Sequence, residues 1–202
     1  MLVNYRGSLG FGQDGVCGLS GKVGTQDVKD VQYATESVLK TGIVKGGKAV
    51  VFGGSHGGFV SAHLVGQYPA LFQAACLRNP VINMLTMVDT TDIPDWCHYE
   101  CGLPYDTLKF NEIGSENYSQ MLKCSPIQYV KNVNVPVLIE LGDSDLRVPG
   151  NQGKQFYFAL HTAGKETKLL LYPGSNHSLD GVDVDADAFV NMMLWFYNAV
   201  GV

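Results

Sequence analysis

The stretch Gly53-Gly54-Ser55-His56-Gly57-Gly58 decides how this chain can fold. It directly follows the apolar run Ala49–Phe52, which reads as a strand, and directly precedes residues 57–67, whose apolar pattern predicts a helix. A strand that turns into a helix within so few residues needs backbone geometry that side chains obstruct and glycine permits. The sequence therefore predicts a tight turn with Ser55 at its apex, and we expect any side chain at the flanking glycine positions to clash with the neighbouring strand or helix.

Strands and helices alternate along the rest of the chain. The patterns predict helices over residues 25–40, 57–67, 151–163 and 184–199, and strands over residues 49–52, 74–77, 135–141 and 168–172. Thr25 is expected to cap the first helix. The strands are continuous apolar runs rather than alternations, which favours a parallel sheet buried on both faces. The fold class is therefore α/β, a mostly parallel sheet with helices on both faces.

Residues 83–125 differ from this pattern, because they are polar and are interrupted by prolines and glycines. We expect an insertion here, with short helices near residues 86–90 and 115–124. No repeat, low-complexity tract or linker divides the chain. We therefore expect residues 1–202 to form a single domain.

Composition excludes several classes of protein. Hydrophobic residues make up 46% of the 202 residues and the net charge is −5, which argues against disorder and against general nucleic-acid binding. No apolar run is long enough for a transmembrane helix, and no signal peptide is visible at the start. The five cysteines are an odd number, which favours reduced thiols in the cytoplasm. Cys97 and Cys101 lack the further ligands of a zinc site, so we expect no metal.

The pattern G-x-S-x-G between a strand and a helix is typical of the nucleophile elbow of α/β-hydrolases. Ser55 is then the nucleophile, and the helix that follows points its N-terminus at it. The backbone N–H of His56 is the expected donor to an oxyanion.

A serine nucleophile needs an acid and a histidine later in the chain, in that order. Asp143 and Asp145 follow the strand over residues 135–141, and His177 follows the last strand. Because the carboxyl ends of parallel strands share one edge of a sheet, these loops and Ser55 should meet there. Spacing alone does not choose between the two aspartates.

Three other histidines compete with His177 for the role of base. His63 and His161 fall on predicted helices, and His98 falls in the insertion. Only His177 occupies the loop after the last strand, so it is the expected base.

Several further motifs carry a resemblance to a known family. They are Asn4–Ser8 through Gly12–Asp14, Gln26–Asp30, Gly53–Gly58, Arg78–Asn83, Asp92–Cys97, Arg147–Pro149, and Leu171–Pro173 with His177. With them, nearly the whole chain resembles the catalytic domain of acylaminoacyl-peptidases in the prolyl oligopeptidase family of serine peptidases.

The resemblance implies release of an N-acylated amino acid from the blocked end of short peptides, without metal or cofactor. The family pattern Asp-x-Arg-x-Pro falls on Asp145, which is then the catalytic acid, and it leaves the role of Asp143 open. The arginine of this pattern falls on Arg147, which is expected to line the substrate pocket; a loop salt bridge is the alternative role. The resemblance also implies that Trp96 of the Asp92–Cys97 motif is a second substrate contact. A homo-oligomer is also implied.

The chain departs from the family pattern at its start. Family members carry a β-propeller and the first strands of the sheet, with a His-Gly-Gly loop that supplies a second oxyanion donor. Here the chain is expected to begin within the strand that ends Val3-Asn4-Tyr5, so that N-terminal strands and propeller are missing. Two alternative functions follow: an esterase with the same triad, and an inactive truncated fragment.

Overall fold

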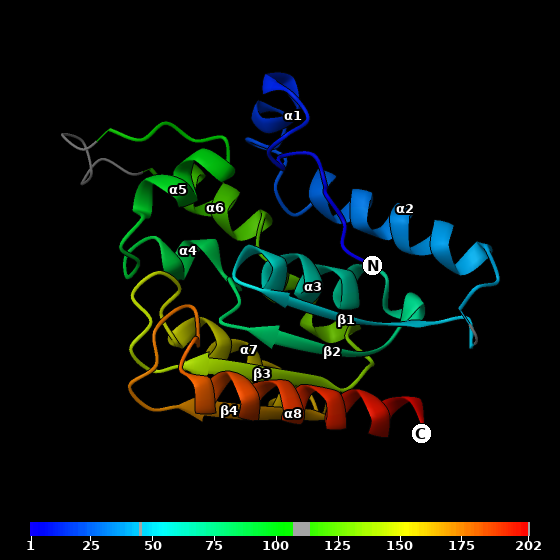
Figure 1. Cartoon of the computed structure of the whole chain (residues 1–202). Coiled ribbons are helices and arrows are strands. Elements are labelled where there is room, and N and C mark those ends of the chain that lie inside the picture. Colours follow the sequence, from blue (N-terminus) through cyan, green and yellow to red (C-terminus); the bar gives the residue numbers. More distant parts are fainter. Residues whose placement is uncertain (45, 107–113, 202) are drawn as a thin grey trace.

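The computed structural model describes residues 1–44, 46–106 and 114–201. At its centre lies a sheet of four parallel strands (Figure 1). They are β1 (Ala49–Gly54), β2 (Phe72–Arg78), β3 (Val137–Gly142) and β4 (Thr167–Tyr172), in the spatial order β1-β2-β3-β4. The predicted parallel sheet is therefore confirmed. The loops that follow the four strands all leave from the same edge.

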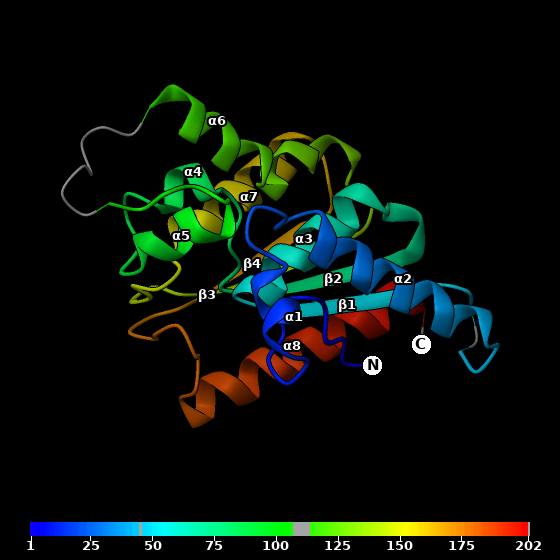
Figure 2. The ribbon, with the colours of Figure 1, turned by 90° about the horizontal axis from the view of Figure 1, so that it is seen from above.

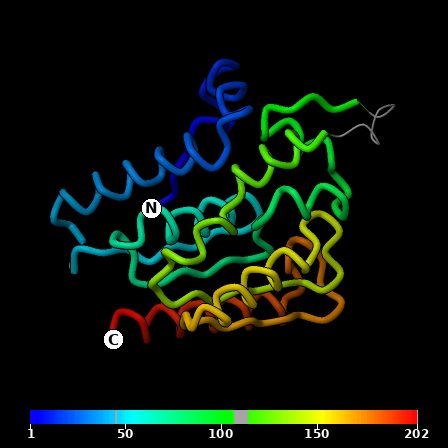
Figure 3. The backbone as a smooth tube through the Cα atoms, turned by 180° about the vertical axis from the view of Figure 1, so that it is seen from behind, coloured from blue at the N-terminus to red at the C-terminus, as the bar shows by residue number. Residues whose placement is uncertain are grey.

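Helices cover both faces of this sheet, as the sequence predicts. α3 (His56–Gln67) and α7 (Asn151–Thr162) lie on one face, and α8 (Val182–Val200) lies on the other (Figure 2). Seen from behind, α7 runs along β3 and β4 (Figure 3). α2 (Gln26–Lys40) packs against α3, further from the sheet.

The two faces of β3 pack in two separate cores, whereas one face of β1 is open at Val50 and Phe52, so the prediction of a sheet buried on both faces is wrong for β1. On β3, Val137 and Ile139 belong to the large core under α3 and α7. Leu138 lies between them in sequence and packs in a small core with Met192 of α8. Because both faces are buried, apolar residues follow one another along β3 without alternation, and the one charged residue, Glu140, is buried and pairs with Arg78.

The four long helices lie within two residues of the ranges predicted for them. On α8, Ala188 and Met192 are buried. The predicted cap of α2 is wrong in its chemistry. Thr25 occupies the N-cap position, but its hydroxyl donates to the carbonyl of Lys22 at 2.7 Å and accepts no bond from the helix. The hydroxyl of Thr25 therefore stabilises the turn that precedes α2 and does not cap the helix.

The expected strand that ends Val3-Asn4-Tyr5 is also wrong. Residues 1–5 form no strand, and β1 pairs with β2 alone in the described sheet. An extended segment becomes a strand only when a neighbour accepts and donates its backbone hydrogen bonds. Within the described residues, no strand pairs with residues 1–5.

Residues 83–125 contain three short helices in their described part. They are α4 (Met84–Met87), α5 (Pro94–Glu100) and α6 (Ser115–Lys123). α4 starts earlier than predicted because the side chain of Asn83 accepts from the N–H of Leu85 at 3.1 Å. α5 was not predicted, and it starts with proline at its first position, where the missing N–H costs nothing. Residues 107–113 of the expected insertion lie outside the described residues.

Three short elements complete the described chain: α1 (Gln13–Cys17) and the 3₁₀ turns η1 (Pro69–Leu71) and η3 (Pro126–Asn132). Over the ranges that the structure covers, none of the helices combines the length and the apolar character needed to cross a bilayer.

Candidate active site

Ser55 occupies the turn between β1 and α3 in a backbone conformation that serine rarely adopts, with φ 57° and ψ −122°. Its N–H donates to the carbonyl of Arg78 at 2.9 Å, and its carbonyl accepts from the N–H of Phe59 at 3.0 Å. The turn is thus held by β2 on one side and by α3 on the other. Such strain is the geometry that a nucleophile elbow requires to expose its hydroxyl group.

The expectation that a side chain would clash at each flanking glycine is only partly confirmed. A Cβ at Gly53 would overlap the carbonyl of Gly57, and one at Gly58 would lie 2.7 Å from Cβ of Pro80. These two positions therefore exclude a side chain, as predicted. At Gly57 the prediction is wrong, because a Cβ there would meet nothing within 4 Å. Gly57 lines a cavity instead of packing against a neighbour.

His56 begins α3, and its backbone N–H bonds to no carbonyl in the described part of the chain. This free donor lies directly after Ser55 at a helix N-terminus, where the partial positive charge favours an anion. The N–H is therefore available for the oxyanion role that the sequence assigns to it.

The side chain of His56 is held at both ring nitrogens. Nδ1 contacts the hydroxyl of Tyr5 at 2.6 Å, and Nε2 contacts Oδ2 of the buried Asp27 at 3.1 Å. Burial, followed by the charges of Asp27 and Glu100, raises the pKa of Tyr5 to about 12, so its hydroxyl keeps its proton. An ionised Asp27 only accepts, so Nε2–H donates to it and Nδ1 accepts from Tyr5. Sequence reasoning missed both partners, although each lies in a motif that carries the family resemblance.

Asp145 and His177 are directly bonded, with His177 Nδ1 at 2.7 Å from Asp145 Oδ2. The side chain of Asp145 is fully buried, and its Oδ1 accepts from the N–H groups of Arg147 and Val148, both at 2.9 Å. The carboxylate is thereby fixed, and its bond to Nδ1–H leaves Nε2 of His177 as the basic nitrogen.

Asp143 has a different task in the same loop. Its Oδ1 accepts from the N–H of Gly174 at 2.6 Å and from the hydroxyl of Ser144 at 3.1 Å. It joins the loop after β3 to the loop after β4. The geometry therefore pairs Asp145, and not Asp143, with His177.

The other histidines lie on helices, away from this pair. His63 is on α3, His161 on α7 and His98 on α5. His63 is buried and bonds the carbonyl of Cys124 at 3.0 Å. None of the three contacts Asp145.

The two expected substrate contacts come from the loop after β3 and from α5. Arg147 is half-exposed and donates from Nε to Asp92 Oδ1 at 2.7 Å. The salt bridge named as its alternative is thus present. Trp96 of α5 has its ring centroid 6.0 Å from that of His56, so it borders the elbow.

Within the part of the chain that the structure describes, no hydrogen bond joins Ser55 Oγ to His177. Contacts of this kind often tighten only in the substrate complex. The described residues also contain no group of three or more His, Cys, Asp or Glu side chains suited to a metal ion.

Comparison with known proteins agrees with this geometry. A family model described as the Prolyl oligopeptidase family matches residues 1–202. The chain belongs to this family. Among curated relatives in the prolyl oligopeptidase family, the human acylamino-acid-releasing enzyme is 48% identical over 201 residues, which is 100% of this chain and 27% of the relative. The enzyme of the same name from Arabidopsis thaliana is 46% identical over 197 residues, covering 97% and 26%.

The chain thus spans about a quarter of the length of these curated relatives. Among solved structures, the uncomplexed acylaminoacyl peptidase of Pyrococcus horikoshii has a TM-score of 0.83 at 27% identity, covering 97% of this chain and 31% of that one. A puromycin hydrolase has a TM-score of 0.86 at 24% identity, covering 99% and 29%, and shows the same fold. The predicted α/β-hydrolase fold, typical of the prolyl oligopeptidase family, is therefore confirmed.

Proposed function

We propose that this chain is a serine peptidase that transfers an acyl group to Ser55 and releases an N-acylated amino acid from the blocked end of short peptides. The observation that carries the proposal is the pairing of a strained serine elbow with a bonded Asp145–His177 pair at one sheet edge. The names of its curated relatives support the substrate class.

Each step of the reaction uses a group that the site holds. Ser55 Oγ attacks the scissile carbonyl while His177 Nε2 takes its proton, and Asp145 stabilises the imidazolium that forms. The N–H of His56 stabilises the oxyanion. His177 then returns the proton to the leaving amine, and water, activated by the same histidine, releases the acylated amino acid from Ser55. These steps need no metal or cofactor. Arg147 and Trp96 are proposed to contact the substrate.

The test uses a fluorophosphonate probe and acetyl-alanyl p-nitroanilide. The native chain should react with the probe at Ser55 and cleave the anilide. Ser55→Ala should lose the label and about 10⁶-fold in kcat, because no other group can form the acyl-enzyme. Full turnover in Ser55→Ala would overturn the assignment. Failure of the folded native chain to react with the probe would favour an inactive fragment.

A matched pair of variants tests the acid. Asp145→Asn should lower kcat by about 10⁴-fold, because it favours the wrong tautomer of His177. Asp143→Asn keeps an oxygen that can accept from Gly174, so it should change kcat by less than about threefold. A larger loss in Asp143→Asn than in Asp145→Asn would reverse the two roles.

Comparison of p-nitrophenyl acetate with the acylated anilide tests the substrate class. A peptidase of the proposed kind should cleave both the ester and the anilide. Because one triad acts on both substrates, Asp145→Asn should lose both activities. Cleavage of the ester alone would show the esterase alternative instead.

Compartment and assembly are further proposals. A cytoplasmic location is supported by the five free thiols, of which four are buried. A homo-oligomer is supported by the family resemblance alone. Light scattering of the purified chain tests the assembly state.

A further inference from the structure

Asn79 is a buried residue at the centre of the sheet edge that carries Ser55, Asp145 and His177. It directly follows β2, and only 1% of its surface is exposed. Its φ of 41° is positive, a backbone region that asparagine tolerates better than most residues. Neither the strand pattern nor the search for a triad singled it out.

The side chain of Asn79 joins two loops that carry the Asp145–His177 pair. Its Nδ2 donates to the carbonyl of His177 at 2.9 Å and, more weakly, to that of Asn176 at 3.4 Å. Its Oδ1 accepts from the N–H of Gly142, the last residue of β3, at 2.9 Å. The loop that bears Asp145 begins at that residue.

The backbone around Asn79 also reaches the nucleophile. Arg78 accepts from the N–H of Ser55 at 2.9 Å, and Val81 donates to the carbonyl of Ser55 at 3.4 Å. The N–H of Asn79 itself donates to the carbonyl of Glu140 at 2.8 Å, which ties this segment to β3. Residues 78–81 therefore contact Ser55, the end of β3 that leads to Asp145, and the loop that bears His177.

Apart from the bond between Asp145 and the His177 ring, the other bonds between the two loops do not reach His177. Asp143 bonds Gly174, and the N–H of Ser144 donates to Ser175. In the described residues, only Asn79 joins the carbonyls of residues 176 and 177 to the sheet. The position of the histidine along its loop thus depends on this amide group.

We infer that Asn79 is a positioning residue that holds the His177 loop in register with Asp145 and Ser55. The inference rests on the proposed function, because it assigns His177 the role of base. A displacement of about 1 Å at a reacting group can lower a rate by about 10²-fold. Loss of the amide should therefore slow the chemical step more than it weakens substrate binding.

The first variant is Asn79→Gly, because glycine adopts positive φ freely and the change removes the side chain alone. The second is Asn79→Asp, which keeps an acceptor for Gly142 and removes the donor to His177. Asn83→Ala is the matched control. Asn83 is also buried and its side chain also bonds backbone, but it contacts α4 and not the His177 loop.

The kinetic readout is a double-variant cycle with His177→Ala, measured on an activated ester. In the native background, Asn79→Gly should lower kcat by about 10²-fold with KM changed less than about threefold. In the His177→Ala background, the same change should have an effect of less than about twofold, because the group that Asn79 positions is gone. Equal losses in both backgrounds would show a merely structural role and overturn the inference.

NMR of the His177 ring tests the same inference without activity. The downfield Nδ1–H signal of the pair with Asp145 should be lost or broadened in both Asn79 variants and not in Asn83→Ala. An unchanged signal in a folded Asn79→Asp protein would overturn the inference. Failure of the native chain to react with the fluorophosphonate probe would overturn the proposed function, while the NMR result would still decide whether Asn79 positions His177.

Discussion

His63 shows how one buried side chain can set the acid stability of this protein. The residue is 1% exposed, Nε2 bonds the carbonyl of Cys124 at 3.0 Å, and Nδ1 bonds the amide of Gln67 at 2.8 Å. The neutral ring satisfies both partners: Nε2–H donates, and Nδ1 accepts from the amide. Burial lowers the pKa of His63 to about 4, so the folded protein resists the proton that the unfolded chain accepts near pH 6.5.

The sign of the pH effect follows from that difference. Between about pH 6.5 and pH 4 the unfolded state binds more protons, so the contribution of His63 is complete above pH 6.5 and is lost as the pH falls to 4. The loss should be roughly 3 kcal/mol. Urea unfolding from pH 7 to pH 4 should show it in the native chain. His63→Gln, which cannot titrate, should lack this part of the pH dependence, and identical slopes in both proteins would contradict the assignment.

At the scale of elements, the turn from β1 into α3 shows what a motif can and cannot specify. The pattern G-x-S-x-G correctly predicts the strand, the turn and the helix, because a tight turn restricts residue types locally. It does not reveal which glycine is sterically required. Pro80, which confines Gly58, lies 22 residues later in the chain and reaches it only after β2 has paired with β1.

Alanine at Gly58 and at Gly57 should therefore have opposite effects. Both positions lie in the first turn of α3, where alanine by itself gains up to about 1 kcal/mol over glycine. At Gly58 the new Cβ would lie 2.7 Å from Pro80, and the overlap should cost about 1–3 kcal/mol, leaving a net loss. At Gly57 the methyl group meets nothing, so stability should stay the same or rise. Denaturant midpoints of the two variants, measured side by side, decide this, and equal midpoints would count against the argument.

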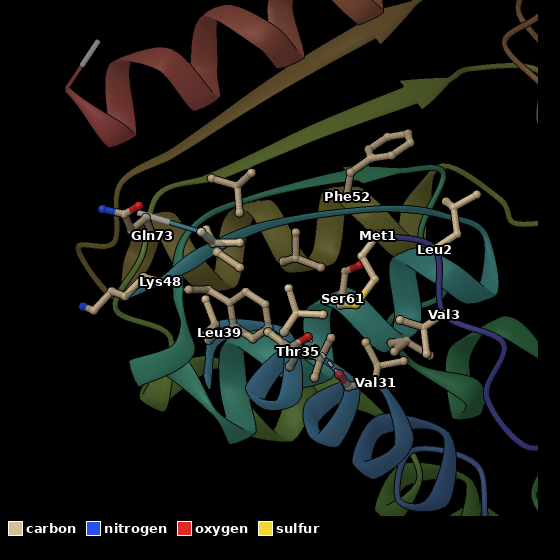
Figure 4. A pocket seen from close by; sticks show the side chains of 18 of the residues that line it. Met1, Leu2, Val3, Val31, Thr35, Leu39, Lys48, Phe52, Ser61 and Gln73 are labelled. Atoms are coloured by element: carbon tan, nitrogen blue, oxygen red, sulfur yellow. Dashed lines mark hydrogen bonds between the residues drawn. The ribbon is translucent and has the colours of Figure 1, made fainter. Parts of the chain in front are cut away.

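At the scale of the whole molecule, the outer side of β1 is an open apolar surface. β1 pairs only with β2 in the described sheet, and Val50 and Phe52 are 38% and 47% exposed. A cavity of about 790 Å³ lies between β1, α2 and α3, lined mainly by apolar side chains (Figure 4). It does not include Ser55, Asp145 or His177. An exposed apolar edge strand of this kind is a site for association.

We therefore expect the purified chain to associate as its concentration rises. Val50→Glu with Phe52→Glu should suppress this, because charges along an edge strand oppose pairing. Glutamate at position 52 would face Arg78, whose guanidinium lies 5.6 Å from the Phe52 ring centroid, so the fold should tolerate it. Sedimentation at several concentrations measures the effect, with the unfolding midpoint as a control for folding. A native chain that stays monomeric, or a variant that associates equally, would contradict the expectation.

The sequence by itself determined the parallel α/β sheet, the positions of the long helices, and the choice of Ser55 and His177 as the expected nucleophile and base. These depend on local patterns: apolar runs, a glycine turn, and polar residues directly after strands. The tertiary structure alone decided that Asp145 and not Asp143 bonds His177, that Tyr5 and Asp27 hold His56, and that Asn79 joins the two loops. It also showed that residues 1–5 form no strand. Each of these depends on which distant segments meet in the fold, and no pattern within one segment records that.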